Sequence, residues 1–365
     1  MPSGIRACRA HEPPAVSWTT STPSNAMFEL AMPDRAELID PAAGDVQARR
    51  PSTHLSLSRV GVTGVSRVIR LRPGGGTAEL ISADLECYVD LGPRQKGVHM
   101  SRFGETVEEA IDAVVLEDSF RAETLAAHVA EHVRERQGAL RAEVRLSARY
   151  PDERLAPASG SRTQEIHVLH ADAVAGPNGT RRVVGVETQG MTACPCAQEL
   201  VAGRARERLE ADGFSEDEIE RVLRHVPVAT HNQRGVGTLW VGAAGEGRDP
   251  IDAETLLHIV EESMSSETYE LMKRSDEVEV VEKAHRRPRF VEDCVREMVR
   301  MGVEAFGSLG DDAFLMARQV NLETIHRHEV VAERYGLLGE LGRELGAGDA
   351  GAARHLSMPE WLESA

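Results

Sequence analysis

Lysine and long apolar runs are nearly missing from this chain of 365 residues. The 42 basic residues include only Lys96, Lys273 and Lys283 as lysines, so 39 of them (42 − 3) are arginine. No run of about 18 apolar residues occurs, so no transmembrane helix is expected. The first 50 residues have no basic segment followed by an apolar one, so they do not resemble a secretory signal peptide.

Cysteine is also scarce, and its distribution argues against a disulfide scaffold. The chain has five cysteines: Cys8, Cys87, Cys194, Cys196 and Cys294. An odd number of thiols, two of them in a C-x-C pair, fits a reducing compartment better than an oxidising one. We therefore expect a cytoplasmic protein.

The chain also has fewer positively than negatively charged residues. The formal net charge is −17, because 59 acidic residues outnumber the 42 basic ones. Such a surface repels nucleic-acid phosphates and anionic membranes, so neither is expected as a partner. An anionic substrate would need a local cluster of Arg or His. The acidic excess and the replacement of lysine by arginine fit either a GC-rich genome or a halophile's adaptation to high salt.

The first half of the chain predicts two hairpins that flank helices. Residues 1–50 are rich in Pro, Ser, Ala and Thr without periodicity, which predicts a disordered extension, with Met27 or Met32 as alternative starts. Beyond it, a repeat of apolar residues predicts helix within 105–136, and a loop is expected at Gly74–Gly76. Alternating apolar and polar residues predict strands at 60–71, 78–91, 140–149 and 164–174.

The second half follows the same order of elements, although no residue-level repeat is visible. A charged helical insert is expected at 198–224. Strands and helices are expected at 183–188, 236–241, 313–320 and after His326 (strands), and at 253–265 and 290–306 (helices). We therefore predict one unit over 51–180, a second over 181–338 that contains the insert, and a peripheral tail over 339–365.

Two short motifs carry most of the chemical information: Cys194-Pro195-Cys196, and His231-Asn232-Gln233-Arg234 after the insert. If the first motif is extended, its two thiols point to the same side. Thiolate and imidazole together suit Zn²⁺ or Fe²⁺, and the nearby Arg234 is suited to gripping a phosphate. The alternatives are a pair of small buried cysteines and a structural histidine followed by a polar turn.

Three further groups are candidates for acid–base or anion chemistry. His326 and His328 would face one side of an extended segment and suit proton transfer or a metal, unless they form a solvated strand edge. Glu277 and Glu292 are carboxylates in short polar motifs, although a helix start alone also favours Glu292. The segment from His99 to Arg102 precedes a predicted helix, where it would either bind an anion or simply connect strand to helix.

Taken together, the motifs resemble the type IB GTP cyclohydrolases, in particular the archaeal branch that makes a cyclic phosphate of dihydroneopterin. The resemblance covers about 55–335, and the long insert between Cys196 and His231 looks like the archaeal branch, because bacterial relatives are shorter there. It rests on six stretches, 97–103, 192–196, 230–234, 273–277, 290–293 and 325–328.

The resemblance implies an α+β tunnelling fold (T-fold). Each chain would contain two tandem ββααββ units with antiparallel sheets, and several subunits would join their sheets into an oligomeric barrel. Because the family's sites form between subunits, a homo-oligomer is expected, either a dimer or a tetramer.

The resemblance also implies roles for individual residues. Those that look like ligands of one Fe²⁺ (or Zn²⁺ or Mn²⁺) per subunit are Cys194, His231 and Glu277. Those that match the family's thiol and histidine pair beside the metal, and would act in catalysis, are Cys196, His326 and His328. Glu292 matches the glutamate that accepts hydrogen bonds from the purine edge. Our own candidates for the ribose-triphosphate end of GTP are His99, Arg102 and Arg234.

The implied reaction opens the imidazole ring of the guanine of GTP by hydrolysis, releases formate and closes a pterin ring. A bound divalent metal would activate water, and the thiol and histidines would act as acids and bases. The archaeal product is 7,8-dihydroneopterin 2′,3′-cyclic phosphate, released with pyrophosphate, whereas bacterial relatives make 7,8-dihydroneopterin triphosphate. Either product would feed pterin biosynthesis, toward methanopterin or folate.

Two alternatives lie outside this activity. A nitrile reductase acting on a deazapurine shares the fold and a similar glutamate anchor, but it uses a nicotinamide cofactor and lacks this metal set. A zinc-stabilised interaction protein would unfold when its metal is removed, whereas an enzyme would lose activity and keep its fold.

Overall fold

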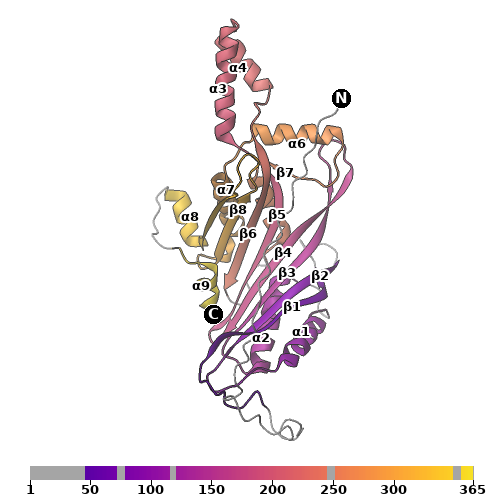
Figure 1. Ribbon diagram of the computed structural model, residues 1–365, viewed down its shortest axis with the longest axis vertical. Helices are drawn as coiled ribbons and strands as arrows, with labels where there is room; N and C mark the ends of the chain where they lie inside the picture. Colours follow the sequence, from indigo (N-terminus) through magenta and orange to yellow (C-terminus); the bar gives the residue numbers. More distant parts are fainter. Residues whose placement is uncertain (1–45, 72–78, 116–120, 245–250, 348–354, 365) are drawn as a thin grey trace, which may run out of the picture. The chain divides into compact units, whose positions relative to one another are not determined.

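All the described strands belong to one antiparallel sheet (Figure 1), in the order β1-β2-β3-β4-β5-β6-β8-β9 with the short β7 beside β5. The computed structural model describes residues 46–71, 79–115, 121–244, 251–347 and 355–364, so nearly all of the expected disordered extension and the Gly74–Gly76 loop lie outside the described residues.

The strands are β1 (Leu57–Leu71), β2 (Glu79–Leu91), β3 (Ala142–Leu155), β4 (Arg162–Gly176), β5 (Gly179–Ala193), β6 (Asn232–Ala244), β7 (Ser266–Glu267), β8 (Phe314–Asn321) and β9 (Val330–Leu337). The helices are α1 (Met100–Val115), α2 (Ala122–Gln137), α3 (Pro195–Ala211), α4 (Glu216–His225), α5 (Ala253–Ser263), α6 (Arg274–Arg286), α7 (Val291–Phe306), α8 (Leu338–Ala347) and α9 (Met358–Glu363), with a short 3₁₀ turn at Gly307–Leu309.

The strands arise from the alternation that the sequence displays. In β3, the buried Val144, Leu146 and Ala148 alternate with less buried residues, as a strand with one covered face requires. The β3–β4 ladder runs without a break from the Ala142↔Ala175 pair to the Leu155↔Arg162 pair. Both strands are therefore longer than the apolar alternation predicts, because ladder pairing continues where burial becomes incomplete.

Neighbouring strand residues divide between two apolar clusters, one on each face of the sheet. Val184 and Leu315 belong to the large cluster that the sheet shares with α1, α2, α5, α7 and α8. Their neighbours Val183 and Phe314 belong to a smaller cluster around Trp361 of α9. Because successive strand residues point to opposite faces, five helices cover one face and α9 covers part of the other. This confirms an α+β fold with an antiparallel sheet, while the tandem T-fold units and the barrel stay predictions.

The C-terminal tail, predicted to be peripheral, packs on the sheet through α9. Trp361 is 1% exposed, and its indole N–H donates to the carbonyl of Asp312 at 3.0 Å. The rings of Trp361 and Phe314 lie 5.7 Å apart. Gly242 leaves the space for this contact, because a Cβ there would approach the indole to 2.8 Å. Helix α9 of the tail is therefore part of the packed structure.

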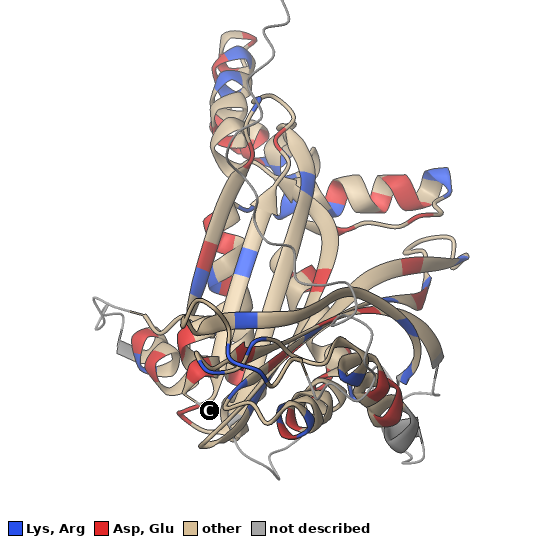
Figure 2. Ribbon diagram, turned by 60° about the horizontal axis from the view of Figure 1, so that its bottom comes forward, with Lys and Arg blue, Asp and Glu red and all other residues tan. Residues whose placement is uncertain are grey.

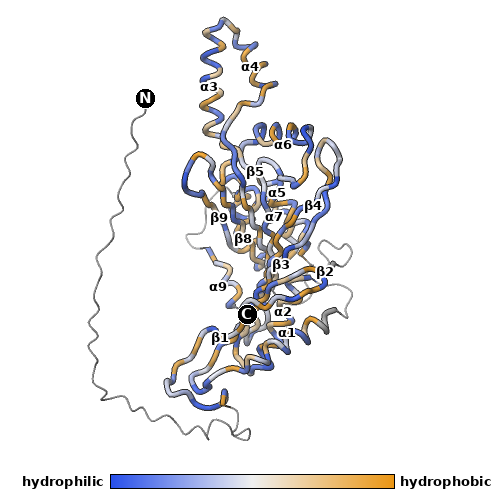
Figure 3. The backbone as a smooth tube through the Cα atoms, turned by 45° about the vertical axis from the view of Figure 1, so that its right-hand side comes forward, coloured by the Kyte–Doolittle hydropathy of each residue, from blue (hydrophilic) through white to orange (hydrophobic). Residues whose placement is uncertain are grey.

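The segment where a helical insert is expected, 198–224, lies in α3, α4 and the turn between them, which extend away from the sheet (Figure 1). No residue of α3 is buried. Arg206 joins the two helices through ion pairs with Glu216 and Glu220. Charges of both signs cover the pair (Figure 2), and hydrophilic residues recur along its tube (Figure 3). Within the described ranges, no helix combines the length and apolarity needed to cross a bilayer.

Candidate functional site

Cys194 and His231 lie at the same end of two neighbouring strands. β5 ends at Ala193 and β6 begins at Asn232, and these two residues pair in the ladder. The backbone N–H of Cys194 donates to the carbonyl of His231 at 3.1 Å. The hydroxyl of Thr230 donates to the carbonyl of Cys194 at 2.8 Å. The two motifs that the insert separates in sequence therefore meet in space.

The imidazole of His231 is held in one orientation. Its side chain is 13% exposed, and its Nδ1 lies 3.1 Å from Oε1 of Gln233. The amide of Gln233 donates through Nε2 to the hydroxyl of Thr192 at 3.1 Å, which leaves Oε1 as the acceptor that faces His231. A histidine that donates its Nδ1–H in this way keeps the lone pair of Nε2 for a metal.

Glu323 adds a buried carboxylate that the sequence analysis missed. Its side chain is 7% exposed, and Oε2 lies 3.7 Å from Nδ1 of His231. Among the described residues, this oxygen has no hydrogen-bond partner. Leaving a buried acceptor without a partner costs about 1–3 kcal/mol, more if it is charged. The only signal in the sequence is a glutamate three positions before His326.

His326 and His328 lie in a bend between β8 and β9, so the expected extended segment is wrong. The ladder between the two strands closes at the Asn321↔Val330 pair, and the histidines fall in the connection. Their rings still stack, with centroids 5.2 Å apart. The ring of His326 also meets that of His231 edge-on at 6.4 Å. We call the group Cys194, His231, Glu323, His326 and His328 the strand-end site.

Cys196 does not share a face with Cys194, so the expected extended C-x-C pair is also wrong. Cys194 is the N-cap of α3, and its Sγ accepts from the N–H of Ala197 at 3.5 Å. Pro195 occupies the first helical position, where its fixed φ favours helix formation. Cys196 is exposed in the first turn. Residues two apart in a helix do not face the same way.

α7 begins beside the same strand end. The N–H of Arg289 donates to the carbonyl of Ala193 at 3.0 Å, and the N–H of Phe290 donates to the Asp293 carboxylate at 3.0 Å. Glu292, in the first turn of α7, is exposed. The predicted purine anchor is therefore close in sequence to a backbone contact with the strand end.

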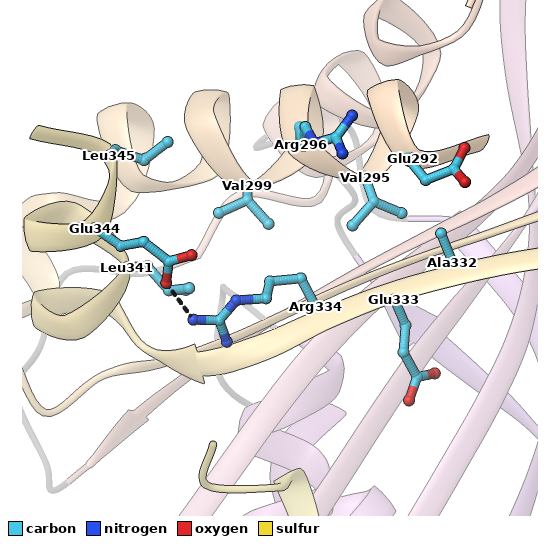
Figure 4. Close-up of a pocket in the computed structure, with 10 residues that line it drawn as sticks. All are labelled: Glu292, Val295, Arg296, Val299, Ala332, Glu333, Arg334, Leu341, Glu344 and Leu345. Carbon is cyan, nitrogen blue, oxygen red and sulfur yellow. Dashed lines mark hydrogen bonds and ion pairs between the residues drawn. The ribbon is translucent and has the colours of Figure 1, made fainter. Parts of the chain in front are cut away.

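Glu292 lines a pocket of about 570 Å³ between α7, β9 and α8 (Figure 4). Val295 and Val299 of α7 give it an apolar wall. On the opposite side, Arg334 of β9 pairs with Glu344 of α8 at 2.6 Å. An apolar wall with a few polar groups is typical of a site for a small molecule.

Glu277 is exposed in the first turn of α6, beside a fully buried neighbour, Asp276. The carboxylate of Asp276 accepts from the N–H groups of Ala158 and Ser159 at 2.9 and 2.7 Å. Burial alone would raise the pKa of Asp276, but these bonds and the Ser159 hydroxyl hold it well below its usual range. They fix this end of α6 on the turn between β3 and β4.

The opposite end of α6 lies near the strand-end site. The side-chain amide of Gln198 on α3 donates to the carbonyl of His285 at 2.6 Å. Eight residues of helix (285 − 277), or about 12 Å, separate Glu277 from this end. Within one chain, the structure does not bring Glu277 together with Cys194 and His231.

The three candidates for the triphosphate end of GTP are also divided. Arg234 is exposed on β6, and its carbonyl accepts from the N–H of Leu322 at 2.9 Å, near the strand-end site. His99 and Arg102 lie at the start of α1, where the amide of Gln137 donates to the carbonyl of His99 at 3.0 Å. α1 lies at the other end of the sheet from α3 (Figure 1). Within one chain, therefore, Arg234 is the one of these three candidates that lies near the strand-end site.

Two side chains of types that bind metals, Cys194 and His231, lie at the strand ends. In the part of the chain that the structure describes, no three His, Cys, Asp or Glu side chains converge as ligands of one ion. A thiol and an imidazole nevertheless suit Zn²⁺ or Fe²⁺, and a nearby cation would compensate the unpartnered Oε2 of Glu323. Cys194 and His231 fit two ligands, and the remaining positions would be filled by water, substrate or another chain.

Comparison with known proteins agrees with these motifs. The sequence profile of the family described as type I GTP cyclohydrolase folE2 matches residues 44–332. The chain is 41% identical over 308 residues to GTP cyclohydrolase MptA of Methanococcus vannielii, an alignment that covers 82% of this chain and 98% of that protein. It is 38% identical over 310 residues to GTP cyclohydrolase MptA of Methanocaldococcus jannaschii, covering 82% and 97%. Among solved structures, uricase from Arthrobacter globiformis aligns with 83% of this chain and 97% of its own, at a TM-score of 0.47 and 11% identity. The resemblance that the motifs indicated is confirmed, and the chain belongs to the type I GTP cyclohydrolase folE2 family.

Proposed function

We propose that this chain is a metal-dependent GTP cyclohydrolase that forms 7,8-dihydroneopterin 2′,3′-cyclic phosphate. Membership of the family and 38–41% identity to proteins named GTP cyclohydrolase MptA support the cyclohydrolase activity. The observation that carries the proposal is the meeting of Cys194 and His231 at one end of the sheet, beside the start of α7.

Glu292 is the proposed anchor of the guanine. Its exposed carboxylate has two oxygens, which match the two neighbouring N–H donors on the edge of guanine. The apolar wall formed by Val295 and Val299 offers a surface for the base in the same pocket. A carboxylate held this way selects guanine because a base without both donors leaves it unpaired.

Cys194 and His231 would hold the metal through Sγ and Nε2, with Fe²⁺, Zn²⁺ or Mn²⁺ as the candidates. When bound, a divalent metal supplies the Lewis acid that makes water nucleophilic at neutral pH. Gln233 and Glu323 would orient the imidazole of His231 and strengthen it as a ligand, the usual role of groups that contact a metal-binding histidine.

Protons would be moved by Cys196, His326 and His328, with imidazole well suited near neutrality. Ring opening needs a proton at the imidazole nitrogen that leaves C8, and release of C8 as formate needs a second hydrolysis. The freed amine then condenses with the carbonyl group of the rearranged ribose, which closes the pterin ring and releases one water. A ribose hydroxyl finally loses its proton and attacks the α-phosphate, which expels pyrophosphate. Arg234 is the proposed phosphate contact from the same chain.

The test is anaerobic incubation of the purified protein with GTP and Fe²⁺ or Zn²⁺, followed by identification of all products. We expect formate, pyrophosphate and the cyclic phosphate in equal amounts. Formate with dihydroneopterin triphosphate and no pyrophosphate would establish the bacterial type of product instead. Absence of formate with every metal would overturn the proposal.

We infer further that Glu277 reaches the metal from a second copy of the chain. In one chain Glu277 lies at the far end of α6 from the contact with α3, and its side chain is exposed. β1 and β9 are the two edge strands of the sheet. Open strand edges pair readily with other chains, which supports assembly of a dimeric or tetrameric barrel with shared sites.

Mixed oligomers test this assignment. Cys194→Ala and Glu277→Ala subunits, each inactive alone, are dissociated, mixed and reassembled. If the site is shared, a mixed dimer contains one site without either substitution, so activity returns to about half of the wild-type value per mixed dimer. If all three ligands come from one chain, no mixed oligomer regains activity. Homo-oligomers of each variant are the controls.

A further inference from the structure

Helices α2 and α7 are both 16 residues long and share seven buried positions. A shift of 169 residues (291 − 122) carries all seven buried positions of α7 onto buried positions of α2. The pairs are Ala122/Val291, Leu125/Cys294, Ala126/Val295, Val129/Met298, Ala130/Val299, Val133/Gly302 and Gln137/Phe306. Each helix is followed by an antiparallel pair of strands, β3–β4 or β8–β9. The two helices therefore occupy equivalent places in the fold.

The second residue of both helices is a glutamate, but the two glutamates differ in burial. Glu292 is exposed and lines the α7 pocket. Glu123 is 5% exposed. Burial raises the pKa of Glu123, and the nearby charges of Arg121 and Arg182 lower it. A carboxylate buried in this way is not available to a nucleobase, so Glu123 is not a counterpart of the proposed purine anchor.

A pocket nevertheless occurs on α2, between the helix and the turn from β4 to β5. Its volume is about 610 Å³, which is enough for a small organic phosphate. Arg134 of the helix and Arg182 of β5 both line it. The hydroxyl of Thr180 donates to Glu131 at 2.6 Å and ties the strand to the helix across the pocket.

Both arginines of this pocket retain hydrogen-bonding capacity. Nε of Arg134 is buried and has no partner among the described residues. Arg182 is near enough to Glu123 to interact electrostatically, but neither guanidinium forms an ion pair with a described carboxylate. Of the acidic residues in the pocket, Glu131 already accepts the Thr180 bond, and Glu135 is exposed. Two arginines and two glutamates therefore line the pocket, and the guanidinium groups are its permanent cations.

We propose that the α2 pocket is a second ligand site, separate from the one at Glu292, which binds a di- or triphosphate group through Arg134 and Arg182. Guanidinium groups bind phosphate oxygens in pairs of parallel hydrogen bonds. Because Glu123 is buried, the site does not recognise the base. Pyrophosphate and nucleotides of any base therefore bind it with similar affinity. The site shares no residue with the proposed cyclohydrolase chemistry.

The experiment is calorimetric titration of the full chain carrying Glu292→Ala, at low ionic strength and without added metal. Inorganic pyrophosphate and ATP are the two probes, which distinguish free phosphate chemistry from nucleotide recognition. We expect both to bind with affinities within about threefold of each other, and Arg134→Ala to weaken both at least tenfold. The matched control is Arg136→Ala on the same helix, because Arg136 is exposed, pairs with Glu109 and does not line the pocket.

Arg182→Ala alone would leave Glu123 buried without its neighbouring charge, so the second variant is the double change Glu123→Gln with Arg182→Gln. It should weaken both probes as Arg134→Ala does. Unchanged binding in Arg134→Ala and in the double variant would overturn the proposal. An equal loss of binding in the Arg136→Ala control would also overturn it, because the probes would then be attracted by the charge of the surface in general. Binding of ATP without binding of pyrophosphate would overturn it as well. GTP turnover of Arg134→Ala on the wild-type background, expected within about twofold of wild type, reports separately on the cyclohydrolase.

Discussion

Two groups of polar side chains lie against the same sheet, and they differ in how completely their atoms are partnered. The first is a buried polar cluster under α5, formed by Asp152, Arg154, His167 and Glu261. Arg154 lies 2.5 Å from a carboxylate oxygen of Glu261 and also pairs with Asp152. His167 is 4% exposed, and its Nδ1 lies 2.8 Å from the hydroxyl of Thr188.

The strand-end site is the second group, and one of its buried polar atoms has no hydrogen-bond partner among the described residues. Among the described residues, Oε2 of Glu323 has no hydrogen-bond partner, and both loop histidines are exposed. Buried polar groups are normally paired because an unpaired one costs free energy. This difference fits a structural role for the buried polar cluster and a role in ligand binding for the strand-end site.

The largest effect is expected from removing a proposed metal ligand. His231→Ala and Cys194→Ala should each lower the rate of GTP turnover on the order of 10⁴-fold, because water activation is lost together with the metal. The free energy of unfolding should change by less than about 1 kcal/mol, since both groups lie at the ends of strands. Metal analysis of the purified variants, with thermal melts, measures both. A variant that retains stoichiometric metal would contradict the ligand assignment.

Glu292→Ala should have the next largest effect. Without the carboxylate, guanine loses its anchor, and kcat/KM for GTP should fall by about 10³-fold while bound metal is unchanged. Glu304→Ala is the control, because Glu304 is exposed on the same helix and pairs with Arg300 at 3.1 Å. Normal turnover by Glu292→Ala would mean that Glu292 does not bind guanine and only stabilises the start of a helix.

Glu261→Ala in the buried polar cluster should show the opposite behaviour. Removing one partner of a buried ion pair leaves the other charge poorly compensated, so the free energy of unfolding should fall by about 3 kcal/mol. Turnover per folded molecule should stay within about twofold. Glu262→Ala is the matched control, because the adjacent Glu262 forms more exposed ion pairs, with Lys283 and Arg287, and should cost under about 1 kcal/mol. If folded Glu261→Ala loses activity, the buried polar cluster has a role in turnover as well as in stability.

His326→Ala and His328→Ala should each lower turnover by about 10²-fold, the usual scale for a general acid or base. Both side chains are exposed, so the melting temperature should change little. Metal content separates two explanations, since a variant that purifies without metal has lost a ligand, and one that keeps metal has lost a proton carrier. Full activity in both variants would show that neither histidine of this loop takes part in turnover.

The smallest effect is a dependence of stability on pH that comes from His167. Burial, with a contribution from the charge of Arg154, lowers its pKa from 6.5 to about 4. Below pH 6.5 the unfolded chain takes up a proton that the folded chain does not, so stability is lost as the pH falls from 6.5 to about 4. Between pH 6 and 5 this amounts to about 1 kcal/mol. His167→Gln should remove it, which denaturant titrations of both proteins at the two pH values would show. An unchanged difference would mean that His167 does not titrate as described.

Much of the fold could be predicted because it depends on local patterns. The alternation of Val144, Leu146 and Ala148 predicts a strand, and the repeat at 290–306 predicts α7 almost to the residue. Trp361 could not be placed, since its contact with the sheet depends on the space left at Gly242, far away in sequence.

The site was predictable where residue type alone carries the chemistry. Cys194 and His231 are recognisable as a thiol and an imidazole in polar motifs, and the structure brings them together. The conformations around Cys196 and His326 were not predictable, because a helix cap and a strand connection decide them. Glu323 gave almost no signal, since a single loop carboxylate is usually solvated. The proposed role of Glu277 depends on assembly, which one sequence does not display.

The proposed metal would lie at the strand ends, between Cys194 and His231. The most direct measurement is the anomalous X-ray signal from crystals of the assembled protein grown with Fe²⁺ or Zn²⁺. We predict one peak per chain, about 2.3 Å from Sγ of Cys194 and about 2.0–2.1 Å from Nε2 of His231, with Glu277 of a second copy beside it. A metal-loaded, active crystal whose peak lies elsewhere, or a peak bound by neither side chain, would contradict the account.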